Sequence, residues 1–211
     1  MIEQVVTELQ FDPDSVRRLD RVRKCGWTPE AALQAYRSDL VDQLVPLFEL
    51  LRNRQLRWIL DIGCGLAGMT AALVKLFDVH TVHLLDGDPN ELGEQHGGFG
   101  PAGKPWNSVK DGLGTLHLNA PLLDTRVHYP GEWIDEQVDL IMSLKSWCHH
   151  YPVGEYLFQV GHWLRPGGLL VVDVREGTDG LGVLERSGFK TVGTLERVPG
   201  KRVRIAFEKT V

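Results

Sequence analysis

The stretch WILDIGCGLAGMTAAL, from Trp58 to Leu73, decides the predicted fold of this chain. An apolar run leads into Gly63, Gly65 and Gly68, which are spaced as G-x-G-x-x-G, and a helical segment follows. This order predicts a strand, a sharp turn and a helix whose free N–H groups face a crevice. Glycines at the first two positions let the backbone approach a ligand, and the third is expected to let helix and strand pack closely. The pattern predicts a cofactor site and leaves the cofactor open.

Composition indicates an ordinary globular protein of 211 residues and 23.7 kDa. The net charge of -5 argues against a nucleic-acid groove, which needs a concentrated basic face. No apolar run approaches the roughly 18–20 residues that span a bilayer, and the N-terminus lacks a signal-peptide core. Three scattered cysteines give neither a disulfide framework nor a zinc knuckle. We therefore expect a cytoplasmic protein with a small-molecule substrate, no membrane or nucleic-acid partner and no metal. The oligomeric state stays open.

Residues 1–56 form a predicted helical extension, and residues 57–211 form the predicted cofactor-binding domain. One short helix is expected in FDPDSVRRLDRVRKCGW. A longer one is expected in TPEAALQAYRSDLVDQLVPLFELL, with Thr28 as N-cap and Pro29 at its first position. Pro46 is expected to kink or interrupt this second helix. The extension is predicted to pack on the main domain and to help close its pocket.

Beyond Trp58, short apolar runs alternate with helical segments, which is typical of a parallel, doubly wound sheet. The proline and glycines of RPGG, residues 165–168, are predicted to form a turn before the apolar strand LLVVDVR. The tail departs from this alternation, because its last two strands are joined by a tight Pro-Gly turn and must pair antiparallel. We predict an α/β fold with a mostly parallel seven-stranded sheet, a C-terminal antiparallel hairpin and N-terminal helices. The glycine-rich segment 93–106 is either a functional loop or a linker.

The segment LDIGCGLAG resembles the first motif of the class I S-adenosylmethionine-dependent methyltransferases, which share a Rossmann-like fold. Asp61, two residues before Gly63, carries the likeness, because nicotinamide-binding folds usually have an apolar residue there. LLDGDP resembles the second motif, VDLIMSL the fourth strand, WLRPGGLLVVDV the fifth, and GFKTV with KRVRIAFEK the terminal hairpin. The resemblance implies that Asp61 helps to hold the amino group of the cofactor's methionine half. Asp86, about twenty residues beyond the glycines, would bind the ribose hydroxyls.

The resemblance runs from about Trp58 to the end of the chain and implies S-adenosyl-L-methionine as cofactor. It departs from the family pattern at Ala67, where a third glycine is usual. The acid that often contacts the adenine amino group has no clear counterpart; Glu132 is the nearest candidate, and Trp133 is a candidate to flank the ring. The predicted cofactor-binding residues are Asp61, Gly63, Cys64, Gly65, Gly68, Asp86, Gly87, Glu132 and Ser143.

A second stretch, SLKSWCHHYP, leaves the predicted fourth strand at its carboxyl end, where open parallel sheets bind their ligands. Methylation of a hydroxyl usually needs a general base, and histidine suits that role near neutral pH. His149 and His150 are the predicted catalytic residues, although either could instead cap a helix. The predicted substrate contacts are Lys145, Trp147 and Tyr151 from this stretch and His96 from the glycine-rich segment.

Missing motifs narrow the predicted acceptor. The run after the fourth strand reads SLKSW, not the Asn/Asp-Pro-Pro-aromatic run of many amino-group methyltransferases, and no Pro-Cys nucleophile is found. These gaps favour O-methylation of a small molecule or a sugar. Two alternatives remain open. One is a binding protein that holds the cofactor without turnover. The other is a nicotinamide-dependent oxidoreductase, which would normally show a second domain or a Tyr-x-x-x-Lys pair.

Overall fold

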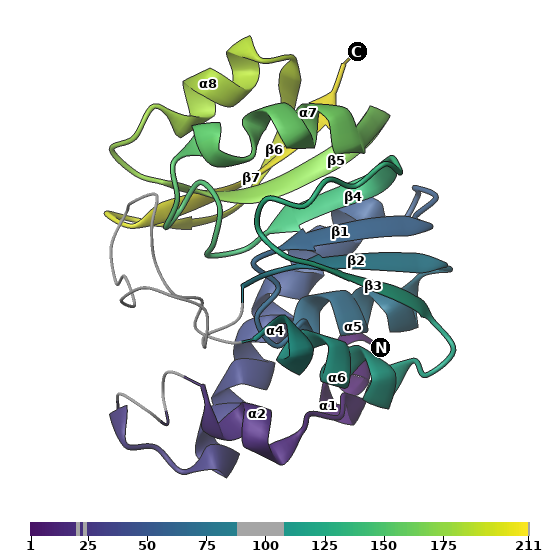
Figure 1. Cartoon of the computed structure of the whole chain (residues 1–211). Coiled ribbons are helices and arrows are strands. Elements are labelled where there is room, and N and C mark those ends of the chain that lie inside the picture. The colour runs from purple at the N-terminus through teal and green to yellow at the C-terminus, as the bar shows by residue number, and fades with distance from the viewer. Residues whose placement is uncertain (20–21, 23–24, 88–107, 211) are drawn as a thin grey trace.

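A computed structural model describes residues 1–19, 22, 25–87 and 108–210. In these residues seven strands form one sheet in the order β3-β2-β1-β4-β5-β7-β6 (Figure 1). The strands are β1 (Trp58–Ile62), β2 (Thr81–Leu85), β3 (Asp124–His128), β4 (Val138–Ser143), β5 (Leu164–Arg175), β6 (Phe189–Val198) and β7 (Arg202–Lys209). The segment 93–106, with His96, lies outside the described residues.

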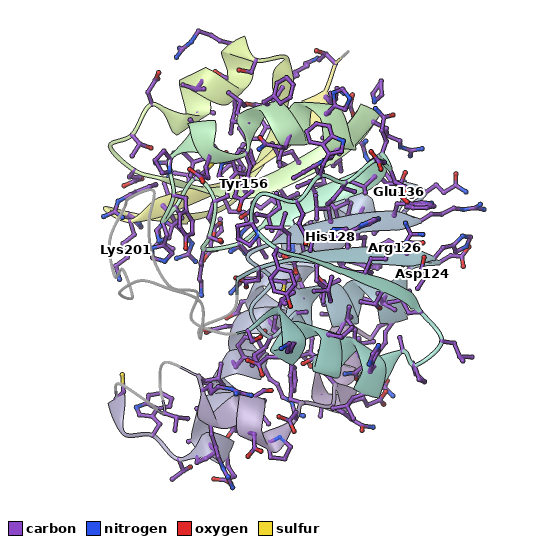
Figure 2. All side chains as sticks on the ribbon, in the orientation of Figure 1. Asp124, Arg126, His128, Glu136, Tyr156 and Lys201 are labelled. Atoms are coloured by element: carbon purple, nitrogen blue, oxygen red, sulfur yellow. The ribbon has the colours of Figure 1, made fainter. Side chains whose placement is uncertain are left out.

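Strand direction confirms the predicted topology. β1 pairs in parallel with β2 and β4, and β2–β3 and β4–β5 are also parallel. β7 runs antiparallel to both β5 and β6, so the last two strands form the expected hairpin. The carboxyl ends of the five parallel strands therefore meet at one edge of the sheet. The hairpin turn lies at that edge, where Figure 2 labels Lys201, and Asp124 and Arg126 lie toward the opposite end.

Helices cover both faces of the sheet (Figure 1). α7 and α8 lie on one face, and α4, α5 and α6 lie on the other with the N-terminal helices. Their bounds are α1 (Ile2–Glu8), α2 (Pro13–Arg17), α4 (Pro29–Leu51), α5 (Gly68–Leu76), α6 (Val109–Asn119), the 3₁₀ turn η1 (Val153–Glu155), α7 (Leu157–Trp163) and α8 (Gly180–Arg186). No helix in the described part of the chain combines the length and apolarity that crossing a bilayer requires.

Each face of the sheet has its own apolar cluster, as a doubly wound sheet requires. The first cluster joins α1, α4, α5 and α6 to one face through residues such as Leu44, Ile59 and Leu73. The second packs α7 and α8 on the other face around Trp163 and Phe207. Alternate residues of the central strands belong to opposite clusters. The N-terminal helices therefore share the core of the sheet.

Two local predictions differ from the structure. α4 starts after Thr28, whose hydroxyl accepts the Ala31 N–H as predicted, and Pro46 does not interrupt the helix, which continues to Leu51. Burial of the helix stripe at Leu44, Leu47 and Leu51 compensates for the one backbone hydrogen bond that a proline removes.

The second correction concerns RPGG. This segment does not separate α7 from the strand, because β5 already begins at Leu164, beside Val138. The register with β4 then shifts, and Leu140 lies opposite Leu169. The predicted turn is thus an irregularity within β5, whose intervening residues are mostly exposed.

Candidate cofactor-binding site

The turn between β1 and α5 uses three left-handed backbone positions: Gly63 at φ 72°, Gly65 at φ 54° and Ala67 at φ 51°. Glycine adopts this conformation freely, whereas an L-residue loses roughly 1–2 kcal/mol there. Ala67 stands where the family pattern has its third glycine, and it keeps the backbone conformation that a glycine would provide. The turn therefore has the predicted shape despite the substitution.

Gly63 allows a close approach between two segments that are distant in sequence. A Cβ atom built on Gly63 would lie 2.0 Å from Ser146 Oγ and 2.3 Å from Ser146 Cβ. The loop after β4 therefore rests directly on the glycine turn. Ser143 strengthens this contact, because its buried hydroxyl donates to Ile62 O at 2.9 Å and accepts the Trp147 N–H at 2.9 Å. Ser143, a predicted cofactor contact, thus joins β1 to this loop.

Gly68 has a different role from the one predicted. A Cβ atom there would lie 2.6 Å from the Tyr36 hydroxyl and 2.9 Å from Leu40, both on α4. Gly68 makes room for the N-terminal helix, whereas we expected it to serve packing between α5 and the sheet. Burial raises the pKa of Tyr36 well above its ordinary value, and the Gly68 N–H opposes that shift. Nothing in the sequence marked Tyr36 as a neighbour of the turn.

Asp61 lies beneath the turn, at 5% exposure. Its Oδ2 accepts a hydrogen bond from Thr70 Oγ1 at 2.5 Å, and burial raises the pKa of its carboxyl to about 7. The carboxylate therefore fixes the first turn of α5. Its expected contact with the amino group of the cofactor stays a prediction.

Cys64 fills the space between the turn and the start of α6. A Cβ atom on Gly112 would lie 3.1 Å from both Cys64 Sγ and Gly65 O, so α6 packs against the turn because Gly112 has no side chain. Burial raises the pKa of the Cys64 thiol, which keeps it neutral.

The N-terminal segment also reaches this end of α6. Asp111 forms a capping box with Ser108 and accepts hydrogen bonds from Ser15 Oγ at 2.7 Å and from Arg18 Nη2 at 2.6 Å. α2 is thereby connected to the helix that borders the glycine turn.

Asp86 follows β2 and faces the turn. Its Oδ2 accepts the Gly65 N–H and its Oδ1 accepts the Gly87 N–H, both at 2.9 Å. Burial raises the pKa of Asp86 to about 6, so the group is largely ionised at neutral pH. Each carboxylate oxygen can accept more than one hydrogen bond. The arrangement fits two adjacent hydroxyl groups, such as those of a ribose.

Glu132 and Trp133 do not face the turn in a comparable way. Glu132 Oε2 accepts the Tyr129 N–H at 2.9 Å and lies 3.8 Å from His128 Nδ1. The Trp133 ring packs on Trp163, 5.9 Å away between centroids, against α7. Neither side chain makes a hydrogen bond or an ion pair with residues 63–68 in the described part of the chain. A role for either at the adenine therefore stays a prediction without geometric support.

For Trp147, the predicted contact with the substrate stays a prediction without geometric support. Its side chain is completely buried, and its indole N–H donates to Val153 O at 3.0 Å. Cys148, at φ 65°, belongs to the same buried cluster. Tyr151, in contrast, is partly exposed, and the Asp86 carboxylate contributes to the raised pKa of its hydroxyl after the larger effect of burial. Tyr151 therefore lies on the side of the loop nearer Asp86.

His149 and His150 lie together, with ring centroids 4.7 Å apart, and both backbone N–H groups donate to Ser146 O. Burial, and then the neighbouring His150, lower the pKa of His149 to about 4. Its Nδ1 is buried without a hydrogen-bond partner among the described residues. The His149 ring is therefore neutral at physiological pH.

The carboxyl edge of the sheet thus brings together Gly63, Gly65, Asp86, Tyr151 and the two histidines. Lys145 lies at the same edge on an exposed, left-handed position at φ 59°. Within the described ranges, no group of three or more histidine, cysteine or acidic side chains is arranged to hold a metal ion.

Comparison with known proteins identifies the fold. No family model matches the sequence, and no curated protein matches it either. A solved structure described as a class I S-adenosylmethionine-dependent methyltransferase from Listeria monocytogenes superposes with a TM-score of 0.55 at 15% identity. That alignment covers 82% of this chain and 60% of the Listeria protein, so this chain spans less than two thirds of its length.

Two further solved methyltransferase structures superpose on this chain to a similar extent. The ribosomal protein L11 methylase from Lactobacillus delbrueckii subsp. bulgaricus gives a TM-score of 0.55 at 15% identity, covering 83% of this chain and 80% of its own. Precorrin-6y C5,15-methyltransferase from Geobacter metallireducens gives a TM-score of 0.53 at 16% identity. That alignment covers 80% of this chain and 87% of the Geobacter protein. The chain has the fold of class I S-adenosylmethionine-dependent methyltransferases. At these identities the likeness describes the fold alone.

Gly63→Ala tests the contact at the turn. We expect it to lower the free energy of unfolding by roughly 2–5 kcal/mol, because backbone strain and overlap with Ser146 add together. The measurement is urea unfolding followed by circular dichroism. Gly131→Ala is the matched control, because Gly131 also has a positive φ, 93°, but open space around its Cβ direction. Equal losses in the two variants would show that Ser146 does not restrict this position.

Proposed function

We propose that this protein is an S-adenosylmethionine-dependent methyltransferase that methylates a hydroxyl group of a small molecule or a sugar. The observation that carries the proposal is the glycine turn with Asp86 facing it at the carboxyl edge of the sheet. The antiparallel β7 supports a methyltransferase over a nicotinamide-dependent enzyme, because the dinucleotide-binding sheet lacks this hairpin.

The residues of the turn fit the proposed cofactor. Gly63 and Gly65 adopt the left-handed conformations that form the turn, and the ionised Asp86 offers acceptors for two ribose hydroxyls. When bound, S-adenosylmethionine would supply a methyl group on a positively charged sulfur, and the sulfur would leave as a neutral thioether when an acceptor oxygen takes the methyl carbon. The protein contributes binding, alignment and removal of a proton. Alignment alone is worth about 7–11 kcal/mol in well-oriented reactions.

The histidine pair supports proton removal from a hydroxyl. The neutral His149 ring can accept a proton at Nε2, because its Nδ1 is buried. Burial, and then the neighbouring His150, lower the pKa of His149, which keeps the ring a weak base until a neighbouring negative charge stabilises the imidazolium. His150, 4.7 Å away between ring centroids, is the second candidate.

The small-molecule acceptor is proposed from the sequence and not from the fold. By their names, the solved structures above act on a ribosomal protein and on precorrin-6y, so one fold serves unrelated acceptors. The chain is acidic and lacks the motifs of nucleic-acid amino methylation, which favours a small acceptor over nucleic acid.

Binding of S-adenosylhomocysteine tests the cofactor assignment. Its affinity should rise as the pH increases through about 6, because the raised pKa of Asp86 means that its carboxylate, the form that accepts ribose hydroxyls, is fully present only above that pH. Calorimetry between pH 5 and 8 measures this. Asp86→Asn should bind about tenfold or more weakly at pH 8 and lose most of the pH dependence.

NAD is the control ligand for the same titration. Tight binding of NAD together with no binding of S-adenosylhomocysteine would reject the proposed cofactor. An unchanged affinity in Asp86→Asn would remove Asp86 from the site.

His149→Gln combined with His150→Gln tests the general base. We expect kcat to fall by about 100-fold or more while the Kd for S-adenosylhomocysteine changes little. His117→Gln, at an exposed position on α6, is the control. If His149 is the base, kcat/KM for the acceptor at saturating cofactor, which reports the acceptor-free enzyme, should stay level as the pH falls toward 5, because the neutral form of His149 persists there down to about pH 4. Full activity in the double variant would contradict the role.

A further inference from the structure

A cluster of paired charges lies where β5 and β7 meet at the carboxyl edge of the sheet. Asp173 is fully buried and accepts two hydrogen bonds from Arg204, at 2.8 and 2.9 Å. Arg202 Nε lies 3.2 Å from the same carboxylate, and Arg202 Nη2 bonds to both oxygens of Glu196 at 2.9 and 3.0 Å. Both guanidinium groups therefore already have carboxylate partners.

Lys145 is attached to this cluster by its backbone. Its N–H donates to Asp173 Oδ2 at 3.0 Å, which holds the residue in its left-handed conformation. Its ammonium group, however, makes no hydrogen bond or ion pair with any residue that the structure describes. A non-glycine residue held in this conformation by a buried acid is typical of a functional position.

The ammonium of Lys145 lies in an environment that favours an anion. The surrounding protein removes water from the ammonium, and this desolvation lowers the pKa of Lys145. Repulsion from Arg202 and Arg204 lowers the pKa further. Asp39 and Asp173 oppose this shift without cancelling it. A negative group beside the ammonium would offset the repulsion from the two guanidinium groups.

Lys145 and His149 share their charged neighbours. Arg202 and Asp173 act on the pKa of both side chains, so both lie against the same ion cluster. Arg175 also lies there, since its Nη1 is 3.5 Å from His149 O. Tyr151, at the other end of the loop, lies toward Asp86. The loop therefore runs from Tyr151, on the side of Asp86, to Lys145, beside the ion cluster at the hairpin.

We propose that the methyl acceptor carries an anionic group, a carboxylate or a phosphate, which pairs with Lys145 while its hydroxyl group faces His149. This inference rests on the proposed function, because it names the class of acceptor for the same site. The anion would also stabilise the imidazolium that forms when His149 takes the hydroxyl proton. A neutral analogue would lose both effects.

Anion binding tests the proposal without turnover. Calorimetry with acetate and with inorganic phosphate is carried out on the protein saturated with S-adenosylhomocysteine, at low ionic strength to limit screening. We expect at least one anion to bind, with a Kd about tenfold or more higher in Lys145→Met and nearly unchanged in Lys145→Arg. Preference between the two anions distinguishes a carboxylate from a phosphate acceptor.

Lys190→Met is the charge-matched control. Lys190 is exposed on β6. Its backbone lies opposite Glu208 of β7, which in turn lies opposite Leu169, far along β5 from the carboxyl edge. Equal anion affinity in Lys145→Met, Lys190→Met and the wild type would overturn the proposal, as would the absence of binding by both anions.

Turnover gives a second readout. In a screen with methyl-labelled cofactor, hydroxy acids or phosphorylated alcohols should be methylated in preference to their neutral amides or esters. Lys145→Met should lower kcat/KM for the anionic acceptors about tenfold and leave the neutral ones nearly unchanged. Equal turnover of neutral and anionic acceptors would contradict the proposal.

The two hypotheses fail separately. If S-adenosylhomocysteine does not bind, the proposed function fails, whereas Lys145-dependent anion binding by the cofactor-free protein can still be measured. If S-adenosylhomocysteine binds but anion binding does not depend on Lys145, only the acceptor class fails.

Discussion

The absence of a side chain at Gly63 is the constraint on which the site depends. Ser146 occupies the space that a Cβ atom would take, so the loop after β4 can lie on the turn after β1. The Ser143 hydroxyl holds the two segments together, because it donates to Ile62 O at the end of β1 and accepts the Trp147 N–H of the loop. Two strand ends that are adjacent in the sheet thereby become two walls of one site. The glycine turn and the loop with the histidines are held as a unit.

The charges around this unit are divided between two sides. On the side of β1 and β2, the buried carboxyl groups of Asp61 and Asp86 have raised pKa values, and the Gly65 N–H of the turn donates to Asp86. On the side of the hairpin, Asp173 organises two arginines and the backbone of Lys145. The antiparallel β7 is essential to this division because it carries both arginines to the carboxyl edge beside β5. The feature that distinguishes the sheet topology therefore also shapes the proposed acceptor region.

The sequence predicted the order of the strands, the turn and the hairpin, because these depend on apolar periodicity, glycine spacing and a short Pro-Gly connection. It could not assign direction to side chains within SLKSWCHHYP. Trp147 is buried and Tyr151 is not, because the left-handed backbone at Cys148 turns the chain between them. Such conformations are unexpected for residues other than glycine, so no pattern indicated them.

The contact of Tyr36 with Gly68 was also beyond prediction, since it joins helices whose packing is set by the whole core. For Glu132, residue type and position suggested a contact with the adenine. In the structure its carboxylate accepts the Tyr129 N–H of its own turn, which the sequence did not indicate. The resemblance to a family indicated which residues to expect at the cofactor. Only the coordinates separate Asp61, which fixes α5 from beneath, from Asp86, which faces the turn.

A crystal structure of the protein grown with S-adenosylhomocysteine is the most direct test of the central claim. The account predicts the nucleoside along the backbone from Gly63 to Ala67, with both ribose hydroxyls on the Asp86 carboxylate. A nucleoside bound elsewhere, or a ribose that leaves Asp86 bonded only to Gly65 and Gly87, would contradict it.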